Sequence, residues 1–217
     1  MNILSPSILS IDFANIERDI KLVLKNGVKY IHLDVMDGMF VPNISFGQPV
    51  IKAVRKVAPD AVFDVHLMIE EPIRYIDTFK DAGADILTVH AEAVSDMNKT
   101  IEAIRHAGMK PSIAISPETG LDALMDYVSL VDMILIMTVR PGYGGQKLIP
   151  ETLDKVRELR DILNERGIEK DIEVDGGVTV DNLTTVLESG ANVIVAGSSI
   201  FGGDIEENVK NFRKILG

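Results

Sequence analysis

Two polar residues alternate within an otherwise apolar segment of the chain. Residues 30–36 read YIHLDVM, a pattern typical of a buried strand, with His32 and Asp34 in its middle. Because side chains alternate across a strand, the imidazole and the carboxylate point to one face and their apolar neighbours to the other. An imidazole beside a carboxylate can bind a divalent cation or move a proton. This face of the strand is therefore a candidate functional surface.

Two further segments end in residues of the same kinds. FDVHLM carries His66, and IEVDGG carries Asp175. Together with His32 and Asp34 they supply two imidazoles and two carboxylates, a suitable ligand set for one divalent cation. A lone histidine at a strand end is more often a hydrogen-bonded core residue, and a lone aspartate before two glycines is usually a turn residue. Four such residues on three strands favour a metal cluster.

Other polar residues accompany these strands. Asp64 and Glu173 are predicted to point inward one layer deeper, either as acceptors that orient His66 and its neighbours or as parts of a buried polar network. His90 ends another apolar segment, so its ring is a candidate to line the same pocket.

A repeated strand and helix pattern positions these residues. Amphipathic stretches of helical period, such as 13–25 and 152–163, alternate with short apolar segments. Phrases such as DAGADILTV read as a helix end, a glycine turn and a buried strand. Repeated units of this kind predict parallel strands with right-handed crossovers. The predicted strands are 3–8, 29–34, 61–67, 85–90, 110–115, 132–137, 170–174 and 192–196.

Eight such units predict one α/β domain over residues 1–217, a single (β/α)8 barrel, although a doubly wound open sheet is the alternative. Barrel enzymes place their active sites at the carboxyl ends of the strands. The four candidate ligands all fall at such ends, which favours the barrel.

The composition of the chain limits which partners and metal ions it can bind. A net charge of −11 argues against a nucleic-acid partner. No apolar run approaches the ~20 residues of a membrane span, and the first residues lack the pattern of a signal peptide, so we expect no membrane partner and a cytoplasmic location. The chain has no cysteine, so a metal must bind through nitrogen and oxygen, which suits Zn, Fe, Mn or Co.

Glycines and methionines also gather at the strand ends. Glycines follow the last three predicted strands, in PGYGGQ, DGG and AGSS. Backbone N–H groups without side-chain bulk can close around an anion, and barrels often bind phosphate after the last two strands. Met36, Met68 and Met137 lie at or just past strand ends and predict an apolar pocket wall beside the metal.

Six segments, in order, resemble the ribulose-phosphate 3-epimerase family: SPSILS, HLDVMDGMFVPN, DVHLM, MTVRPGYGGQ, EVDGGV and AGSSIF. The match covers essentially the whole chain. The resemblance implies a metal-dependent (β/α)8 isomerase of the pentose phosphate pathway, a homo-oligomer that acts on a phosphorylated ketose. It would interconvert D-ribulose 5-phosphate and D-xylulose 5-phosphate.

The resemblance also assigns residues. It implies His32, Asp34, His66 and Asp175 as metal ligands, with Asp34 and Asp175 as the catalytic acid/base pair, one for each face of the sugar carbon. It implies that the loop at 142–145 closes over the sugar. The residues that it implies for substrate binding are Ser7, His66, Gly142, Tyr143, Gly144, Gly145, Asp175, Gly176, Gly177, Gly197 and Ser198.

Three positions depart from the family pattern. Arg140 and Ser116 stand where asparagine is usual, and Met39 replaces a polar residue. These departures leave open a 3-epimerase of a longer ketose phosphate such as D-allulose 6-phosphate, although the intact pair Gly176-Gly177 favours the pentulose. Arg140 either latches the loop over the site or pairs with an acidic neighbour at the surface.

Two other classes of function are disfavoured. A metal-dependent aldolase or decarboxylase on a related barrel would carry Asp-x-Lys-x-x-Asp, but here His66 stands where the lysine would be. A sugar-phosphate or metal-binding module would keep the glycine loops but has no need of two carboxylates on opposite faces.

Overall fold

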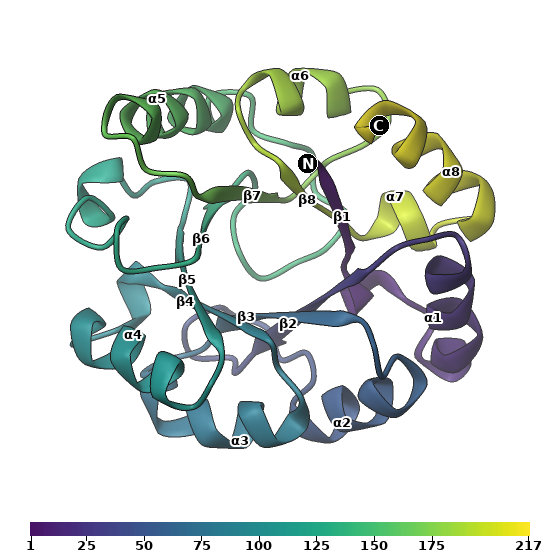
Figure 1. Ribbon diagram of the computed structural model, residues 1–217. Helices are drawn as coiled ribbons and strands as arrows, with labels where there is room; N and C mark the ends of the chain where they lie inside the picture. Colours follow the sequence, from purple (N-terminus) through teal and green to yellow (C-terminus); the bar gives the residue numbers. More distant parts are fainter.

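The computed structural model describes residues 1–217, and eight parallel strands form one sheet (Figure 1). The order in the sheet is β1-β8-β7-β6-β5-β4-β3-β2, so each strand from β2 to β7 neighbours the next along the chain, and β8 neighbours β1. All eight predicted strands are present, within two residues at either end. They are β1 Ile3–Pro6, β2 Tyr30–Met36, β3 Val62–Met68, β4 Ile86–His90, β5 Lys110–Ile115, β6 Met133–Met137, β7 Asp171–Asp175 and β8 Val193–Ala196.

The sheet closes into a barrel at the seam between β1 and β2. An isolated parallel bridge pairs Ser7, just beyond β1, with His32 in β2. The ring is therefore joined here by one residue pair, at the level of the candidate site, whereas the other neighbours share longer ladders. The predicted barrel is confirmed over the doubly wound alternative.

Helices surround the barrel, with the two chain termini close together beside α8 (Figure 1). No helix is long and apolar enough to cross a membrane. The α-helices are α1 Ile16–Lys25, α2 Gln48–Val57, α3 Ile76–Ala82, α4 Met97–His106, α5 Thr152–Glu165, α6 Leu183–Glu188, α7 Ser198–Phe201 and α8 Ile205–Leu216.

The connection from β5 to β6 departs from the predicted repeat, because it contains no α-helix. It begins with a 3-10 turn at Leu121–Ala123 and continues as turns. Successive hydrogen bonds run from the N–H of Leu124 to Leu121 O and from the N–H of Tyr127 to Leu124 O. Leu121, Leu124 and Val128 are buried, so the segment still covers the barrel with a helical spacing of apolar residues.

The strands separate an apolar outer face from a polar interior. Leu33 and Val65 are fully buried in the main hydrophobic cluster between strands and helices. Their alternating neighbours His32, Asp64 and His66 are equally buried but lie with other polar groups inside the barrel. The predicted two-faced strands therefore fold with the chemistry inward, and burial of the apolar outer face stabilises that orientation.

Candidate active site

The four predicted ligands converge at the carboxyl ends of β2, β3 and β7. One ligand atom from each of His32, Asp34, His66 and Asp175 lies within 4.8 Å of the others. The strand register explains the convergence, because Asp34 pairs with His66 in the neighbouring strand. Two imidazole nitrogens and two carboxylates facing one point form a set that could hold a divalent metal ion.

His32 points one ring nitrogen at the cluster and the other at a carboxylate below it. Its Nε2 lies 3.2 Å from Asp34 Oδ1 and 3.8 Å from Asp175 Oδ2. Its Nδ1 lies 2.8 Å from Oδ2 of Asp64, which also accepts a 3.2 Å hydrogen bond from the Ser5 hydroxyl. Asp64 therefore holds the His32 ring with Nε2 toward the cluster, an arrangement common behind metal-binding histidines.

His66 has the opposite orientation. Its Nδ1 faces the cluster, 3.1 Å from Asp34 Oδ1 and 3.7 Å from Asp175 Oδ2. Its Nε2 lies 2.9 Å from Nε2 of His90. Asp64 thus orients His32 rather than His66, and the group behind His66 is a second imidazole.

His90 does not line the cavity, contrary to its expected place. Its ring is fully buried between His66 and Phe40, with ring centroids 5.0 and 4.8 Å away. Burial lowers its pKa to about 4, although a hydrogen bond to Glu92 opposes the shift.

The charges in the cluster are strongly coupled. Burial alone would lower the pKa of His32, but the charges of Asp34 and Asp64 and the hydrogen bonds to them raise it well above its usual value. Burial would raise the pKa of Asp34, but the charges and hydrogen bonds of His32 and His66 lower it. Burial likewise opposes a raised pKa at His66, where hydrogen bonds to Asp175 and Asp34 prevail. Without a cation the cluster therefore favours ionised Asp34 beside protonated histidines.

Glu173 is the exception among the buried carboxyl groups. Burial and the charge of nearby Asp64 raise its pKa well above the usual range. Oε1 lies 3.5 Å from His32 Nδ1, and neither carboxyl oxygen has a hydrogen-bond partner. Glu173 is therefore the neutral neighbour of the charged pair His32–Asp64.

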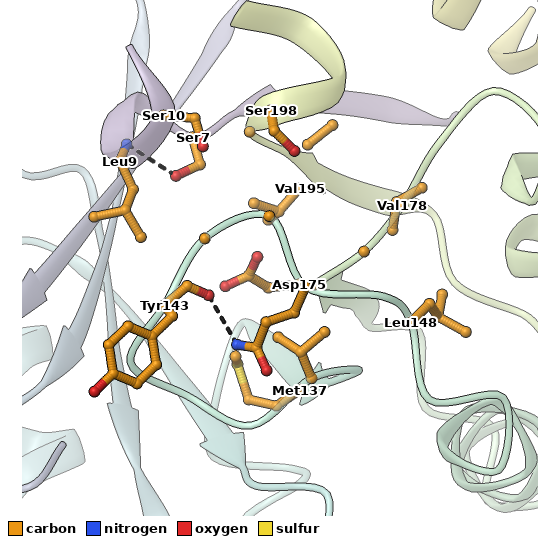
Figure 2. Close-up of a pocket in the computed structure, with 18 of the residues that line it drawn as sticks. Ser7, Leu9, Ser10, Met137, Tyr143, Leu148, Asp175, Val178, Val195 and Ser198 are labelled. Carbon is orange, nitrogen blue, oxygen red and sulfur yellow. Dashed lines mark hydrogen bonds between the residues drawn. The ribbon is translucent and has the colours of Figure 1, made fainter. Parts of the chain in front are cut away.

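A cavity of about 520 Å³ opens above the cluster. Asp34 lies at its floor, whereas His32 and His66 are fully buried and do not line it. The contact predicted between His66 and substrate therefore stays a prediction. Figure 2 shows the Asp175 carboxylate inside the cavity. The other predicted pocket residues that line it are Ser7, Met36, Met68, Met137, Gly142, Tyr143, Gly144, Gly145, Gly176, Gly177, Gly197 and Ser198.

The loop after β6 lies against the loop after β2. The side chain of Asn43 donates a 2.8 Å hydrogen bond to Gly142 O, and the Tyr143 hydroxyl donates one of 3.2 Å to Pro42 O. Gln146 donates from its side chain to Tyr143 O at 2.8 Å (Figure 2). These contacts hold the loop across one side of the cavity mouth.

The glycine pair after β7 is required by close packing. Gly177 has φ +68°, and a Cβ there would lie 2.1 Å from the backbone nitrogen of Leu148. Gly176 has φ +126°, with its Cβ position 2.3 Å from a methyl group of Val139. Backbone from the β6 and β7 loops therefore meets at this edge of the cavity in a way that a side chain would prevent.

The three methionines form two patches rather than one wall. Met36 and Met68 cluster with Val41, and Met137 packs with Val139 and neighbouring strand residues. All three methionines line the cavity and are nearly inaccessible to solvent.

Arg140 lies at the cavity rim and pairs outward. Its Nε is 2.7 Å from Oε1 of Glu118, and the two side chains are 77% and 58% exposed. This geometry favours the surface pair over a latch on the site. Met39 is 70% exposed and does not line the cavity, and Ser116 contributes a backbone hydrogen bond to Glu92.

Two residues of the site were not anticipated from the sequence. Ser5 bonds Asp64, and Glu92 bonds His90 Nδ1 at 3.1 Å. Ser5 precedes Ser7 by two residues, so alternation along the first strand already places both hydroxyls on one face. Glu92 follows β4 in a 3-10 turn, where no strand periodicity applies.

Residues 3–201 match the Ribulose-phosphate 3 epimerase family. The chain belongs to this family. A ribulose-phosphate 3-epimerase of Bacillus subtilis (strain 168) is 49% identical over 200 residues, covering 91% of each chain. One from Synechocystis sp. is 48% identical over 201 residues, covering 92% of this chain and 87% of the relative.

Solved structures support the fold. The 3-hexulose-6-phosphate synthase from Salmonella typhimurium superposes with a TM-score of 0.74 at 19% identity, covering 100% of this chain and 98% of that one. The predicted family, enzyme class and epimerase function are confirmed. The family acts on phosphorylated sugars, and the buried cluster has the donors for a metal ion.

Proposed function

We propose that this epimerase interconverts D-ribulose 5-phosphate and D-xylulose 5-phosphate, with Asp34 and Asp175 as its acid/base pair. The observation that carries the proposal is their shared position, because both carboxylates line one cavity and come from different strands, β2 and β7. Inverting a carbon beside a ketone requires a proton to leave one face and another to arrive on the opposite face. One carboxylate on each side of a flat intermediate meets that requirement.

Asp34 enters this scheme as the ionised member. Its pKa is lowered, against the effect of burial, by the charges and hydrogen bonds of His32 and His66. The Ser7 hydroxyl donates a further 2.5 Å hydrogen bond to its Oδ2. Asp34 is thus oriented and ionised, the form that accepts a proton, while the more exposed Asp175 serves the other face.

The cluster fits a resident divalent cation. Each histidine turns one nitrogen to the common point and has its other nitrogen near a buried partner, so the donor set is oriented without a ligand. We propose His32, Asp34, His66 and Asp175 as the ligands of Zn, Fe, Mn or Co. A cation held by these residues would supply positive charge that offsets the negative charge developing on the substrate.

The glycine loops are proposed to hold the phosphate. Gly177, Gly197 and Ser198 follow β7 and β8 and line the cavity. Their backbone N–H groups suit an anion. Ser7 would contact the sugar, and the loop at 142–145 would keep water from the intermediate.

Substrate turnover tests the proposal. The purified protein is assayed with each of the four divalent metals, using D-ribulose 5-phosphate and D-allulose 6-phosphate in parallel. We expect a higher kcat/KM for the pentulose. A higher kcat/KM for D-allulose 6-phosphate would make the hexulose phosphate the substrate instead. If neither sugar is epimerised, the proposed function is wrong. The cytoplasmic location and the homo-oligomeric state stay predictions from the sequence.

A further inference from the structure

Two imidazoles share a hydrogen bond behind the candidate metal site. His66 Nε2 and His90 Nε2 lie 2.9 Å apart, and both rings are fully buried. At that distance one nitrogen donates a hydrogen and the other accepts it. Two directions are possible, and they leave His66 Nδ1, the atom that faces the cluster, in opposite states. If His90 donates, neutral His66 carries its hydrogen on Nδ1. If His66 donates, a neutral ring leaves Nδ1 with a bare lone pair.

The far side of His90 distinguishes the two directions. Its Nδ1 lies 3.1 Å from Oε2 of Glu92. The other oxygen of Glu92 accepts hydrogen bonds from the Ser116 backbone N–H at 2.8 Å and from the Thr119 hydroxyl. Burial opposes ionisation of Glu92, but the hydrogen bonds from His90, Thr119 and Ser116 lower its pKa to about 2. An ionised carboxylate only accepts, so His90 carries its hydrogen on Nδ1 and leaves Nε2 bare.

We propose that Glu92 and His90 are positioning residues that fix the hydrogen of His66 on Nε2 and leave Nδ1 free to bind the metal. The chain of donors runs from His66 to His90 to Glu92. This inference rests on the metal site of the proposed function and adds a part that reaches the loop after β5. Asp64 contacts His32 directly and so fixes which of its ring nitrogens carries the hydrogen. For His66 the carboxylate of Glu92 does the same through the ring of His90.

The reverse direction is unfavourable at His90 and incompatible with a cation bound to His66. It would turn the bare Nδ1 of His90 toward the carboxylate of Glu92, so that two acceptors face each other at 3.1 Å. It would also place the hydrogen of neutral His66 on Nδ1, where it can bond Asp34 Oδ1 3.1 Å away but removes the lone pair that a cation requires. Two buried acceptors that face each other without a hydrogen between them are costly enough to keep one direction dominant.

Glu92→Gln tests the direction, because the backbone N–H of Ser116 is a fixed donor. The new amide turns its oxygen toward Ser116 and offers its NH₂ group to His90 Nδ1. His90 Nδ1 then accepts from that NH₂ group, so the ring hydrogen moves to His90 Nε2 and the chain reverses. Glu118→Gln is the matched control, because Glu118 lies after β5 in the loop that carries Ser116 and Thr119, and its exposed side chain pairs with Arg140.

Two readouts separate positioning from folding. Nitrogen-15 NMR of the histidine rings in the metal-free protein, recorded at a pH at which His66 is neutral, reports which nitrogen of His90 carries the hydrogen. Competition with a chromophoric chelator reports the affinity for Co²⁺ alone. We expect Nδ1–H in the wild type and the control, and Nε2–H with ~10–100-fold weaker Co²⁺ binding in Glu92→Gln.

The wild-type spectrum alone can overturn the inference, even if the variant does not fold. Hydrogen on His90 Nε2 in the wild type would contradict it, as would Glu92→Gln with unchanged tautomer and Co²⁺ affinity. A wild type that binds no Co²⁺, Zn²⁺, Mn²⁺ or Fe²⁺ would instead refute the metal site of the proposed function, while the tautomer of His90 still tests the chain.

Discussion

The Ser7 hydroxyl donates a 2.5 Å hydrogen bond to Oδ2 of Asp34 across the seam of the barrel. Ser7 also forms the backbone bridge to His32 that joins the first and second strands. The residue that closes the ring therefore also orients the carboxylate proposed to take the substrate proton. Closure of the fold and assembly of the site depend on the same few atoms.

Ser7→Ala tests the importance of that contact. A hydrogen bond to a charged group contributes ~1.5–3 kcal/mol, so its loss should reduce kcat by ~10–100-fold. Steady-state kinetics measures the change, with thermal unfolding to confirm that the variant is folded. Ser95→Ala, which removes a hydroxyl bonded to Glu71 at the surface, is the control and should keep wild-type kinetics. Equal kinetics in both variants would show that Ser7 does not assist Asp34.

Metal binding should release protons. The raised pKa of His32 keeps it protonated near neutral pH in the metal-free protein, and a cation must displace that proton. Affinity for Zn²⁺ should therefore rise from pH 6 to pH 8, with release of ~1 proton or more per ion at pH 7. Calorimetry in two buffers of different ionisation enthalpy measures this. Proton uptake, or no proton change, would contradict the assigned charge state.

The same shift fixes a stability trend for the metal-free protein. The folded-state pKa of His32 lies above the unfolded value of about 6.5, so protonated His32 adds to the free energy of unfolding. This contribution is complete below pH 6.5 and is lost as the pH rises through the folded-state pKa.

Two buried carboxyl groups beside His32 should respond differently to amidation. Asp64 is the charged acceptor of His32 Nδ1, so Asp64→Asn should weaken Zn²⁺ binding by ~10–100-fold. Glu173 has a raised pKa and is neutral, so Glu173→Gln removes no charge and should keep Zn²⁺ affinity within about threefold of the wild type. Chelator competition compares them. Equal losses would mean that Glu173 is ionised in the folded protein.

Arg140→Asn restores the residue that the family pattern leads us to expect. The exposed pair with Glu118 contributes ~0–1 kcal/mol, so kcat/KM for D-ribulose 5-phosphate should stay within about fivefold. The ratio of kcat/KM between that substrate and D-allulose 6-phosphate should also persist. A changed ratio would show that Arg140 reaches the substrate when the loop moves.

Sequence patterns predicted most of the fold because each strand can be identified from the residues within it. An apolar outer face alternating with His32, Asp34 and His66 identified both the strands and their inward residues. The turns between β5 and β6 were missed, because their buried leucines keep a helical spacing while the backbone does not.

The partners behind the ligands were harder to predict. Asp64 pairs with His32 instead of His66 because of the register between β2 and β3, which the sequence does not encode locally. Glu92 lies in a loop, and its contact with His90 depends on how the β4 and β5 ends meet.

The central claim is that Asp34 and Asp175 each serve one face of the substrate carbon. Asp175→Asn, prepared with metal and checked for occupancy, is incubated with either pentulose phosphate in D₂O, and deuterium at C3 is followed by NMR. The account predicts that the wild type epimerises with deuterium at C3. It predicts that the variant exchanges the C3 proton of one epimer but epimerises ~10²–10⁴-fold more slowly. Epimerisation at a near wild-type rate in the metal-loaded variant would contradict it.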